Sequence, residues 1–298
     1  MDTADKTAQR MDTAEDSVKP SEILCPVCFH RCRLKPGQRG SCRARGNIGG
    51  ASVSLNYGLL TSVALDPIEK KPLAMFHPGS MILSVGSFGC NLHCPFCQNW
   101  EISQQDEQDI PADYVSPEQL AALALREKEN GHGNIGVAFT YNEPMIGWEY
   151  VRDTAEQVRA LGMQNVLVTN GSVVPAVLQE VLPFIDAMNI DLKAFSKHYY
   201  DWIGGDLETV KTFIQLSAAA GCHVELTTLI VPQENDTDAE MEQLASWIAS
   251  VGRGIPLHVT RSFPRYKTAD KTAADPAVVR RLASIAAGHL DHVFTGNL

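Results

Sequence analysis

The sequence predicts an α/β protein built from repeating strand–helix units, which form either a barrel or a doubly wound sheet. From residue 81 onward, short runs rich in β-branched residues alternate with amphipathic helical patterns. Strands separated by helices pair in parallel through right-handed crossovers. Six or seven such repeats favour a partial or complete barrel, in which ligands bind at the carboxyl ends of the strands. A chain of 298 residues is long enough to bury a core of this kind.

The strands and the clearest helices can be located from local patterns. The expected strands are 81–87, 134–140, 164–169, 187–192, 223–229, 256–260 and 292–295. One helix begins after Ser116, because Pro117 and Gln119 complete an N-cap, a proline at the first helical position and a capping box. A second begins near Asp236. Its apolar residues, Met241, Leu244, Trp247 and Ile248, recur at three-to-four spacing and are interpreted as core packing.

Charge and composition exclude several classes of function. The chain has 25 Lys and Arg against 35 Asp and Glu, so its net charge of −10 repels nucleic acid and anionic membranes. No run approaches the length of a membrane span, and the N-terminus lacks the apolar core of a signal peptide. We therefore expect a cytoplasmic protein without nucleic-acid or membrane partners. Dinucleotide and nucleoside triphosphate binding lose support, because no Gly-x-Gly-x-x-Gly follows the first strand and no Walker-type loop occurs.

We expect three regions along the chain. Residues 1–22 are polar and contain the tetrapeptide MDTA twice, a composition typical of a disordered tail. Residues 23–65 form a cysteine-rich metal-binding segment, of which residues 23–50 have too few apolar side chains for a core of their own. Residues 66–298 form the barrel.

Seven of the eight cysteines lie between residues 25 and 97. In a chain without an export signal, closely spaced thiols more often bind metal or carry out redox chemistry than form disulfides. The first four, Cys25, Cys28, Cys32 and Cys42, supply four soft ligands that fit zinc or an auxiliary iron–sulfur cluster. There are two alternatives. His30 could replace one of the four cysteines as a ligand, or all four could be free reduced thiols. Cys222 is interpreted as an inert core thiol.

The other three cysteines, Cys90, Cys94 and Cys97, form a C-x3-C-x2-C run directly after the first strand of the repeat. Three thiolates on a short loop can bind three corners of a cubane iron–sulfur cluster. The remaining iron then stays open to a small molecule, much as catalytic zinc keeps an open position. The alternatives are a zinc site with His93 as fourth ligand, a ferredoxin-like electron carrier and scattered core cysteines. Adjacent His93 and Cys94 would reach one tetrahedral ion only awkwardly.

Polar residues also lie at or beyond the ends of later strands. Glu143 follows strand 134–140, where its carboxylate suits the ammonium group of a bound amino acid; the alternative is an acid that starts a helix. Asn170, Asp191 and Lys193 converge on the same rim, although Asp191 and Lys193 could serve only to pair with each other. His258 lies within a late strand, where a lone histidine is more often a satisfied core residue.

The cysteine run resembles the cluster loop of the radical S-adenosylmethionine enzymes, in which this spacing has an aromatic residue, here Phe96, before the last cysteine. Further motifs, among them GNIGG, LDPIEKKPL, AFTYNEP, VTNG, NIDLKAF and LIVPQEND, resemble the radical enzyme of the AmmeMemoRadiSam system. That family is related to the pyruvate formate-lyase activating enzymes. The resemblance covers residues 23–298. Members usually continue into a cysteine-containing tail, whereas this sequence ends at Leu298.

The resemblance implies a partial (β/α)6 barrel of the radical SAM type that holds a [4Fe–4S] cluster and S-adenosylmethionine. Reductive cleavage of S-adenosylmethionine would release methionine and a 5′-deoxyadenosyl radical, which abstracts hydrogen from a substrate. The implied cluster ligands are Cys90, Cys94 and Cys97, and the implied cofactor-binding residues are Phe96, Glu143, Asn170, Asp191, Lys193 and His258. The expected partners are S-adenosylmethionine, an unidentified small-molecule or protein substrate, and a flavodoxin- or ferredoxin-like reductant.

Two other functions stay open at this point. The first is an activating enzyme for a glycyl-radical enzyme, which would leave a persistent glycyl radical in a partner protein. The second is a non-catalytic module with two zinc sites, which would be colourless and contain stoichiometric zinc.

Overall fold

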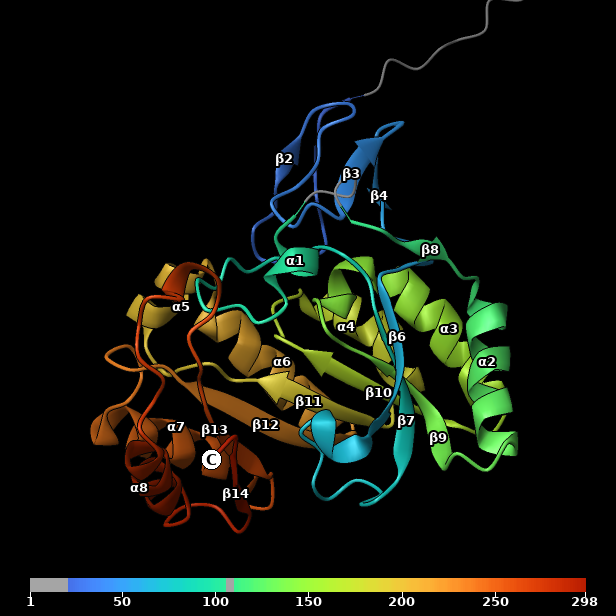
Figure 1. Ribbon diagram of the computed structural model, residues 1–298. Coiled ribbons are helices and arrows are strands. Elements are labelled where there is room, and N and C mark those ends of the chain that lie inside the picture. The colour runs from blue at the N-terminus through green and yellow to red at the C-terminus, as the bar shows by residue number, and fades with distance from the viewer. Residues whose placement is uncertain (1–20, 106–109) are drawn as a thin grey trace, which may run out of the picture.

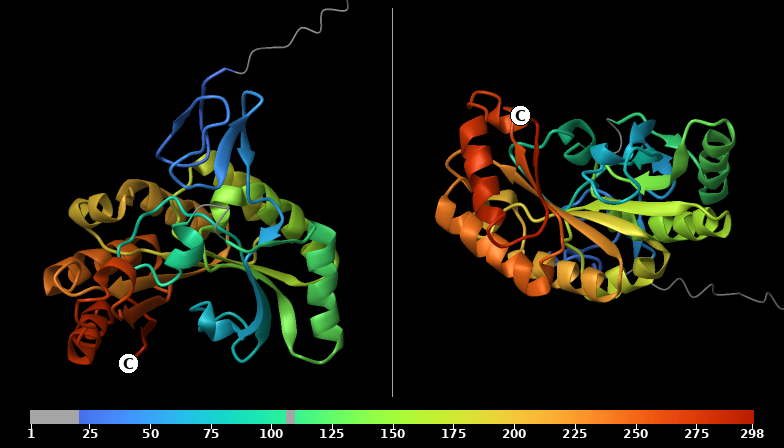
Figure 2. Two further views of the ribbon diagram at one scale, coloured as in Figure 1. Left: turned by 45° about the horizontal axis from the view of Figure 1, so that its top comes forward. Right: turned by 90° about the horizontal axis from the view of Figure 1, so that it is seen from below.

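The core of the molecule is an eight-stranded sheet that curves into an open barrel (Figures 1 and 2). The computed structural model describes residues 21–105 and 110–298, so the tail expected over residues 1–22 lies almost wholly outside the described residues. Across the sheet the strand order is β14-β13-β12-β11-β10-β9-β7-β6. The edge strands β14 and β6 do not pair with each other, so the barrel is partial, as the sequence predicts.

All seven expected strands form, and they pair in parallel with one another across the sheet. They are β7 (Met81–Gly86), β9 (Asn134–Phe139), β10 (Gln164–Thr169), β11 (Ala187–Asp191), β12 (His223–Ile230), β13 (Leu257–Arg261) and β14 (Val293–Gly296). Most of their residues are buried, because parallel sheets are covered on both faces. The carboxyl ends of all seven strands consequently share one rim.

Helices cover the outer face of the sheet (Figure 2). They are α2 (Pro117–Glu129), α3 (Trp148–Ala160), α4 (Pro175–Val181), α5 (Lys197–Ile203), α6 (Leu207–Ala219), α7 (Asp238–Gly252) and α8 (Pro276–Ala286). The capping box expected at Ser116 and Gln119 is present at the start of α2. Helix α7 begins after Thr237, and three of its four expected core residues are buried while Trp247 is partly buried. Within the described ranges, no helix has the length and apolar character needed to cross a membrane.

Strand β6 (Ser62–Pro67) was not expected from the sequence. It runs antiparallel to β7 and places Leu65 opposite Leu83. The boundary expected between residues 65 and 66 falls inside this strand, so the N-terminal segment and the barrel are joined by a shared element. The missing signal is understandable, because the run SVALDP has a single antiparallel partner and lies in no strand–helix repeat.

The residues after β6 close the amino end of the barrel. The chain passes through η1 (Ile68–Lys70) and then residues 71–76, which we call the floor segment. The Nδ2 of Asn189 donates to the carbonyl of Pro72, and the buried Glu225 carboxylate accepts from the backbone N–H groups of Ala74 and Met75. These contacts hold the floor segment against β11 and β12, on the inside of the curved sheet.

The N-terminal segment forms a small β-rich unit above the barrel (Figure 1). It contains the antiparallel pairs β1 (Ile23–Leu24) with β2 (Arg33–Leu34) and β3 (Arg45–Ile48) with β4 (Ala51–Ser54), and then β5 (Leu59–Leu60), which pairs with β8 (Asp113–Tyr114). Arg45 is 2% exposed and its guanidinium lies 2.7 Å from the Glu149 carboxylate of α3. The Nδ2 of Asn56 donates to the carbonyl of Phe88, just before the cysteine loop.

Candidate active site

A cavity of about 1070 Å³ lies inside the barrel, between the carboxyl-end loops and the floor segment. Three of the eight thiols line it, those of Cys90, Cys94 and Cys97. Every other residue that the resemblance assigns to the cofactor also lines it, namely Phe96, Glu143, Asn170, Asp191, Lys193 and His258. The fold therefore brings the whole predicted set to one chamber.

The three cavity thiols lie on the loop between β7 and the short helix α1 (Trp100–Ser103). Burial raises the pKa of Cys90 well above its usual value, and the Glu143 carboxylate adds to this effect. Burial likewise raises the pKa of Cys94 to about 12. A coordinating metal deprotonates its thiol ligands, so bound iron would supply the positive charge that these thiolates lack.

The donor set fits a cluster that is open at one corner. Among residues 21–105 and 110–298, no three His, Cys, Asp or Glu side chains already form a metal-binding group, so the three thiols must turn toward a common centre. His93 does not line the cavity. Its Nε2 lies 2.8 Å from Ser41 Oγ and its Nδ1 lies 3.2 Å from Gln104 Oε1. Both ring nitrogens are engaged, which argues against zinc with His93 as fourth ligand.

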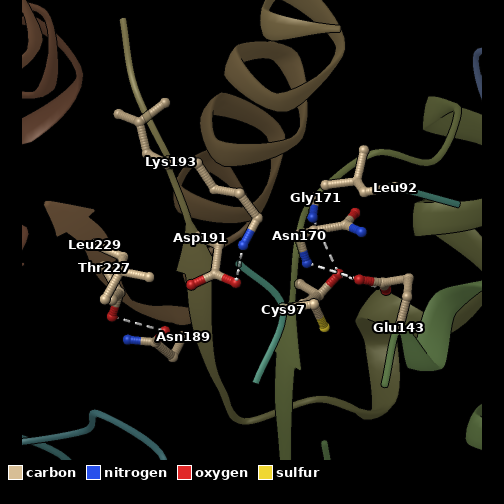
Figure 3. Close-up of polar contacts among 12 residues, drawn as sticks. Leu92, Cys97, Glu143, Asn170, Gly171, Asn189, Asp191, Lys193, Thr227 and Leu229 are labelled. Atoms are coloured by element: carbon tan, nitrogen blue, oxygen red, sulfur yellow. Dashed lines mark hydrogen bonds and ion pairs between the residues drawn. The ribbon is translucent and has the colours of Figure 1, made fainter. Parts of the chain in front are cut away.

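Glu143 lies beside the cysteine loop with 2% exposure (Figure 3). Its carboxylate accepts hydrogen bonds from Thr169 Oγ1 at 2.7 Å, from the backbone N–H of Asn170 at 2.7 Å and from that of Met145 at 2.9 Å. Burial raises the pKa of Glu143 to about 7, although these hydrogen bonds oppose the rise. The contact with Met145 caps η3 (Pro144–Gly147), so the carboxylate both starts a helix and faces the cavity.

Asp191 and Lys193 lie at the end of β11 (Figure 3). Lys193 Nζ and Asp191 Oδ2 are 2.8 Å apart, which is the mutual pairing that the sequence left as an alternative. Both residues nevertheless line the cavity. Burial opposes the charge of Lys193, but Asp191 and the Cys94 thiol outweigh it and raise the pKa of Lys193. The pair thus presents opposite charges side by side, close to the cysteine loop.

His258 lies deeper in the barrel and is 8% exposed. Its Nε2 lies 2.7 Å from Glu225 Oε2, and its ring stacks on Phe294 with the ring centroids 5.2 Å apart. It is a partnered core histidine and a cavity residue at once. Glu225 was not singled out from the sequence, although the alternation of β12 places it on the same face as His223, which contacts its other oxygen.

A charged group that lines the cavity, formed by Asp66, Lys71 and Tyr141, was also not expected from the sequence. Lys71 is 2% exposed, and its Nζ lies 2.8 Å from Asp66 Oδ2 and 4.8 Å from the centre of the Tyr141 ring. The hydroxyl of Tyr141 donates to the same carboxylate at 2.7 Å. Asn99 Nδ2 donates to the carbonyl of Tyr141, which ties this group to the cysteine loop. Both motifs were noted in the sequence, but nothing in either indicates that they meet.

The four N-terminal cysteines stay outside this cavity. Three of them, Cys25, Cys28 and Cys42, are buried, and Cys32 is partly buried. Burial raises the pKa of Cys28 to about 12 and also raises that of Cys42. Cys222 is partly buried in the core, and burial raises its pKa to about 12.

Comparison with known proteins decides the family. The model of the radical SAM superfamily matches residues 84–248, a stretch that begins within β7, includes the cysteine loop and ends within α7. The chain belongs to the radical SAM superfamily. It is therefore an S-adenosylmethionine-dependent enzyme, and its family implies a [4Fe–4S] cluster and bound S-adenosylmethionine.

Relatives of this radical SAM chain differ in how much of it they cover. An uncharacterized protein of Methanocaldococcus jannaschii is 36% identical over 286 residues, which is 95% of this chain and 84% of the relative. The benzylsuccinate synthase activating enzyme of Thauera aromatica is 23% identical over 65% of this chain and 58% of its own length. The structure of Streptococcus suis SuiB bound to precursor peptide SuiA gives a TM-score of 0.57 at 14% identity, with 78% and 51% covered, and supports the fold alone.

Proposed function

We propose that this radical SAM enzyme binds a [4Fe–4S] cluster through Cys90, Cys94 and Cys97 and cleaves S-adenosylmethionine reductively. The released 5′-deoxyadenosyl radical then abstracts hydrogen from a substrate. When bound and reduced, the cluster supplies the single electron that breaks a carbon–sulfur bond of the sulfonium and leaves methionine. The observation that carries the proposal is the meeting of three thiols and the predicted polar residues in one cavity.

The polar residues of the cavity would each bind a different part of S-adenosylmethionine. The Glu143 carboxylate suits the ammonium group of the methionine moiety, because its three protein donors fix both oxygens in place. By the family resemblance, Asn170, Asp191 and Lys193 would lie near S-adenosylmethionine and the reacting carbon, and all three line the cavity. By the same resemblance, His258, held by Glu225, would contact the ribose or carboxylate region of bound S-adenosylmethionine. Phe96 packs against Trp202 with ring centroids 5.5 Å apart and supports the cysteine loop.

The test is anaerobic reconstitution with iron and sulfide, followed by dithionite and S-adenosylmethionine. The wild-type protein should produce 5′-deoxyadenosine and methionine. Replacement of Cys90, Cys94 or Cys97 by alanine should abolish both products, whereas C222A, the matched control, should leave them unchanged. Well-reconstituted wild-type protein that yields no 5′-deoxyadenosine would contradict the proposal.

An activating enzyme is the second candidate, favoured by the likeness to the benzylsuccinate synthase activating enzyme. In that case the substrate is a glycine residue of a partner protein, and electron paramagnetic resonance should detect a persistent glycyl radical after turnover. A flavodoxin- or ferredoxin-like protein would supply the electron in either case. A small-molecule substrate would instead give a released product and no lasting protein radical.

We also propose that Cys25, Cys28, Cys32 and Cys42 bind a metal, zinc or an auxiliary cluster. The N-terminal segment has few apolar side chains, so the binding free energy of a metal would contribute to its folding. Elemental analysis of the C90A/C94A/C97A triple variant measures this site alone. Stoichiometric zinc or iron in that variant supports the proposal, and a metal-free folded variant contradicts it.

A further inference from the structure

Three segments that are distant in sequence meet at Asn91, the residue after Cys90. They are the N-terminal segment near residues 27–30, the cysteine loop, and residues 170–174 after β10. Val174 N–H donates to the carbonyl of Val27 at 3.0 Å, next to an antiparallel bridge between Cys28 and Val173. The N-terminal segment therefore packs directly against the loop that carries Asn170.

Asn91 is fully buried and contacts all three segments. Its Oδ1 accepts from Asn170 Nδ2 at 2.9 Å, and its Nδ2 donates to the carbonyl of Ser172 at 3.1 Å. Its own carbonyl accepts from His30 Nε2 at 2.8 Å. A hydrogen bond from its side chain also lowers the pKa of Cys28, against the larger effect of burial.

Asn170 carries these contacts to the cavity. Its Nδ2 lies 3.6 Å from Cys90 Sγ, and its backbone N–H donates to Glu143 at 2.7 Å. Its Oδ1 accepts from the backbone N–H of Ser172, which completes a closed set of amide contacts. The orientation of the Asn170 side chain is thus determined by Asn91 on one side and Ser172 on the other.

We infer that Asn91 is a positioning residue that couples the docked N-terminal segment to the Cys90 thiol and the Glu143 carboxylate through Asn170. This inference rests on the proposed function for the role of Cys90 and Glu143, but the contacts themselves do not depend on it. Without the Asn91 side chain, the Asn170 amide and the Ser172 carbonyl lose buried partners, and Asn170 is free to turn away from Cys90. Without the His30 side chain, the carbonyl of Asn91 in the cysteine loop loses the hydrogen bond that it accepts from the imidazole ring.

Asn165 provides a matched control. It is a fully buried asparagine at the opposite end of β10, and its Nδ2 donates to two backbone carbonyls, those of Ala155 and Phe184. N165A therefore removes a comparable buried amide far from the cysteine loop. A general loss of stability should affect N165A and N91A alike, whereas positioning of Cys90 should be lost in N91A alone.

The first measurement uses metal-free, reduced protein, so it does not require a working enzyme. Alkylation of Cys90 by iodoacetamide is followed by mass spectrometry, with Cys222 in the same molecule as the reference thiol. N91A should raise the Cys90 rate relative to Cys222 by at least about tenfold, the effect of roughly one buried hydrogen bond. N165A should leave the ratio within about twofold of wild type.

His30 variants keep the inference open to refutation if N91A does not fold. H30A should raise the alkylation ratio, and H30Q, whose amide can still donate to the Asn91 carbonyl, should restore it. In reconstituted protein, N91A should also weaken S-adenosylmethionine binding by about tenfold relative to N165A. Equal alkylation ratios in N91A and N165A, or in H30A and wild type, would overturn the inference. If the wild type binds no cluster or S-adenosylmethionine, the proposed function fails while the alkylation result still decides the positioning role.

Discussion

The contact between Gly89 and the N-terminal segment makes a sharp prediction about stability. Gly89 has φ of +87°, and a Cβ built on it would lie 2.5 Å from the carbonyl oxygen of Cys42 and 2.8 Å from the Cβ of Ala44. Neither atom is the end of a flexible side chain. G89A must therefore adopt an unfavourable backbone conformation and also separate two packed segments.

The two costs can be separated with a second glycine. Gly131 has φ of +77° but nothing within 4 Å of a built Cβ, so G131A carries only the backbone cost, about 1–2 kcal/mol. G89A adds the cost of overpacking, about 1–3 kcal/mol more. The gain from a less flexible unfolded chain is common to both variants and cancels.

Urea unfolding followed by circular dichroism measures the difference. G89A should be less stable than G131A by about 1–3 kcal/mol, and its melting temperature should be lower by a few degrees in a chain of this size. Iron retention after reconstitution should fall in G89A only, since the distortion adjoins Cys90. Equal stability of the two variants would show that Cys42 does not press against Gly89 in solution.

Three further predictions concern other polar groups. His223, His258 and two backbone amides lower the pKa of Glu225 to about 2 against the effect of burial, so its stabilisation is complete above its ordinary pKa of 4.5 and is lost as the pH falls toward 2. E225Q should be less stable at neutral pH and should flatten the fall in melting temperature across that window; an unchanged pH profile would contradict this. K71M leaves Asp66 without its buried partner and should cost about 3 kcal/mol in urea unfolding, a result refuted by a loss below about 1 kcal/mol. S116A removes the capping hydroxyl of α2 and should cost about 1 kcal/mol, whereas a change confined to a few tenths would mean that the cap contributes little.

Much of the fold follows from local sequence, because each parallel strand is a short apolar run and helices such as α2 and α7 begin at capping residues. The rim residues Glu143, Asn170 and Asp191 could be predicted for the same reason, since a residue that follows a parallel strand lies at the carboxyl end of the sheet. The family resemblance then gave the chemistry of the cysteine loop. These inferences need no knowledge of distant contacts.

The rest depends on contacts between segments far apart in the chain. Strand β6 lies outside the repeat, and its pairing with β7 is what carries Asp66 and Lys71 into the cavity. Two of the partners of Glu225, the backbone N–H groups of Ala74 and Met75, come from the floor segment, about 150 residues away in sequence. Asn91 looks like an ordinary spacer between two cysteines. No pattern along the chain reports such meetings, so only the three-dimensional arrangement reveals them.

The position of the floor segment affects how small molecules enter and leave the cavity. The tethers of this segment to Glu225 and Asn189 hold it across the amino end of the barrel, so the carboxyl-end rim and the gap between the unpaired edge strands are the more open sides of the cavity. Substrates that enter and products that leave therefore share these open sides. A bulky substrate bound at the rim would block the release of smaller products from the cavity behind it. The larger molecule would then have to dissociate first.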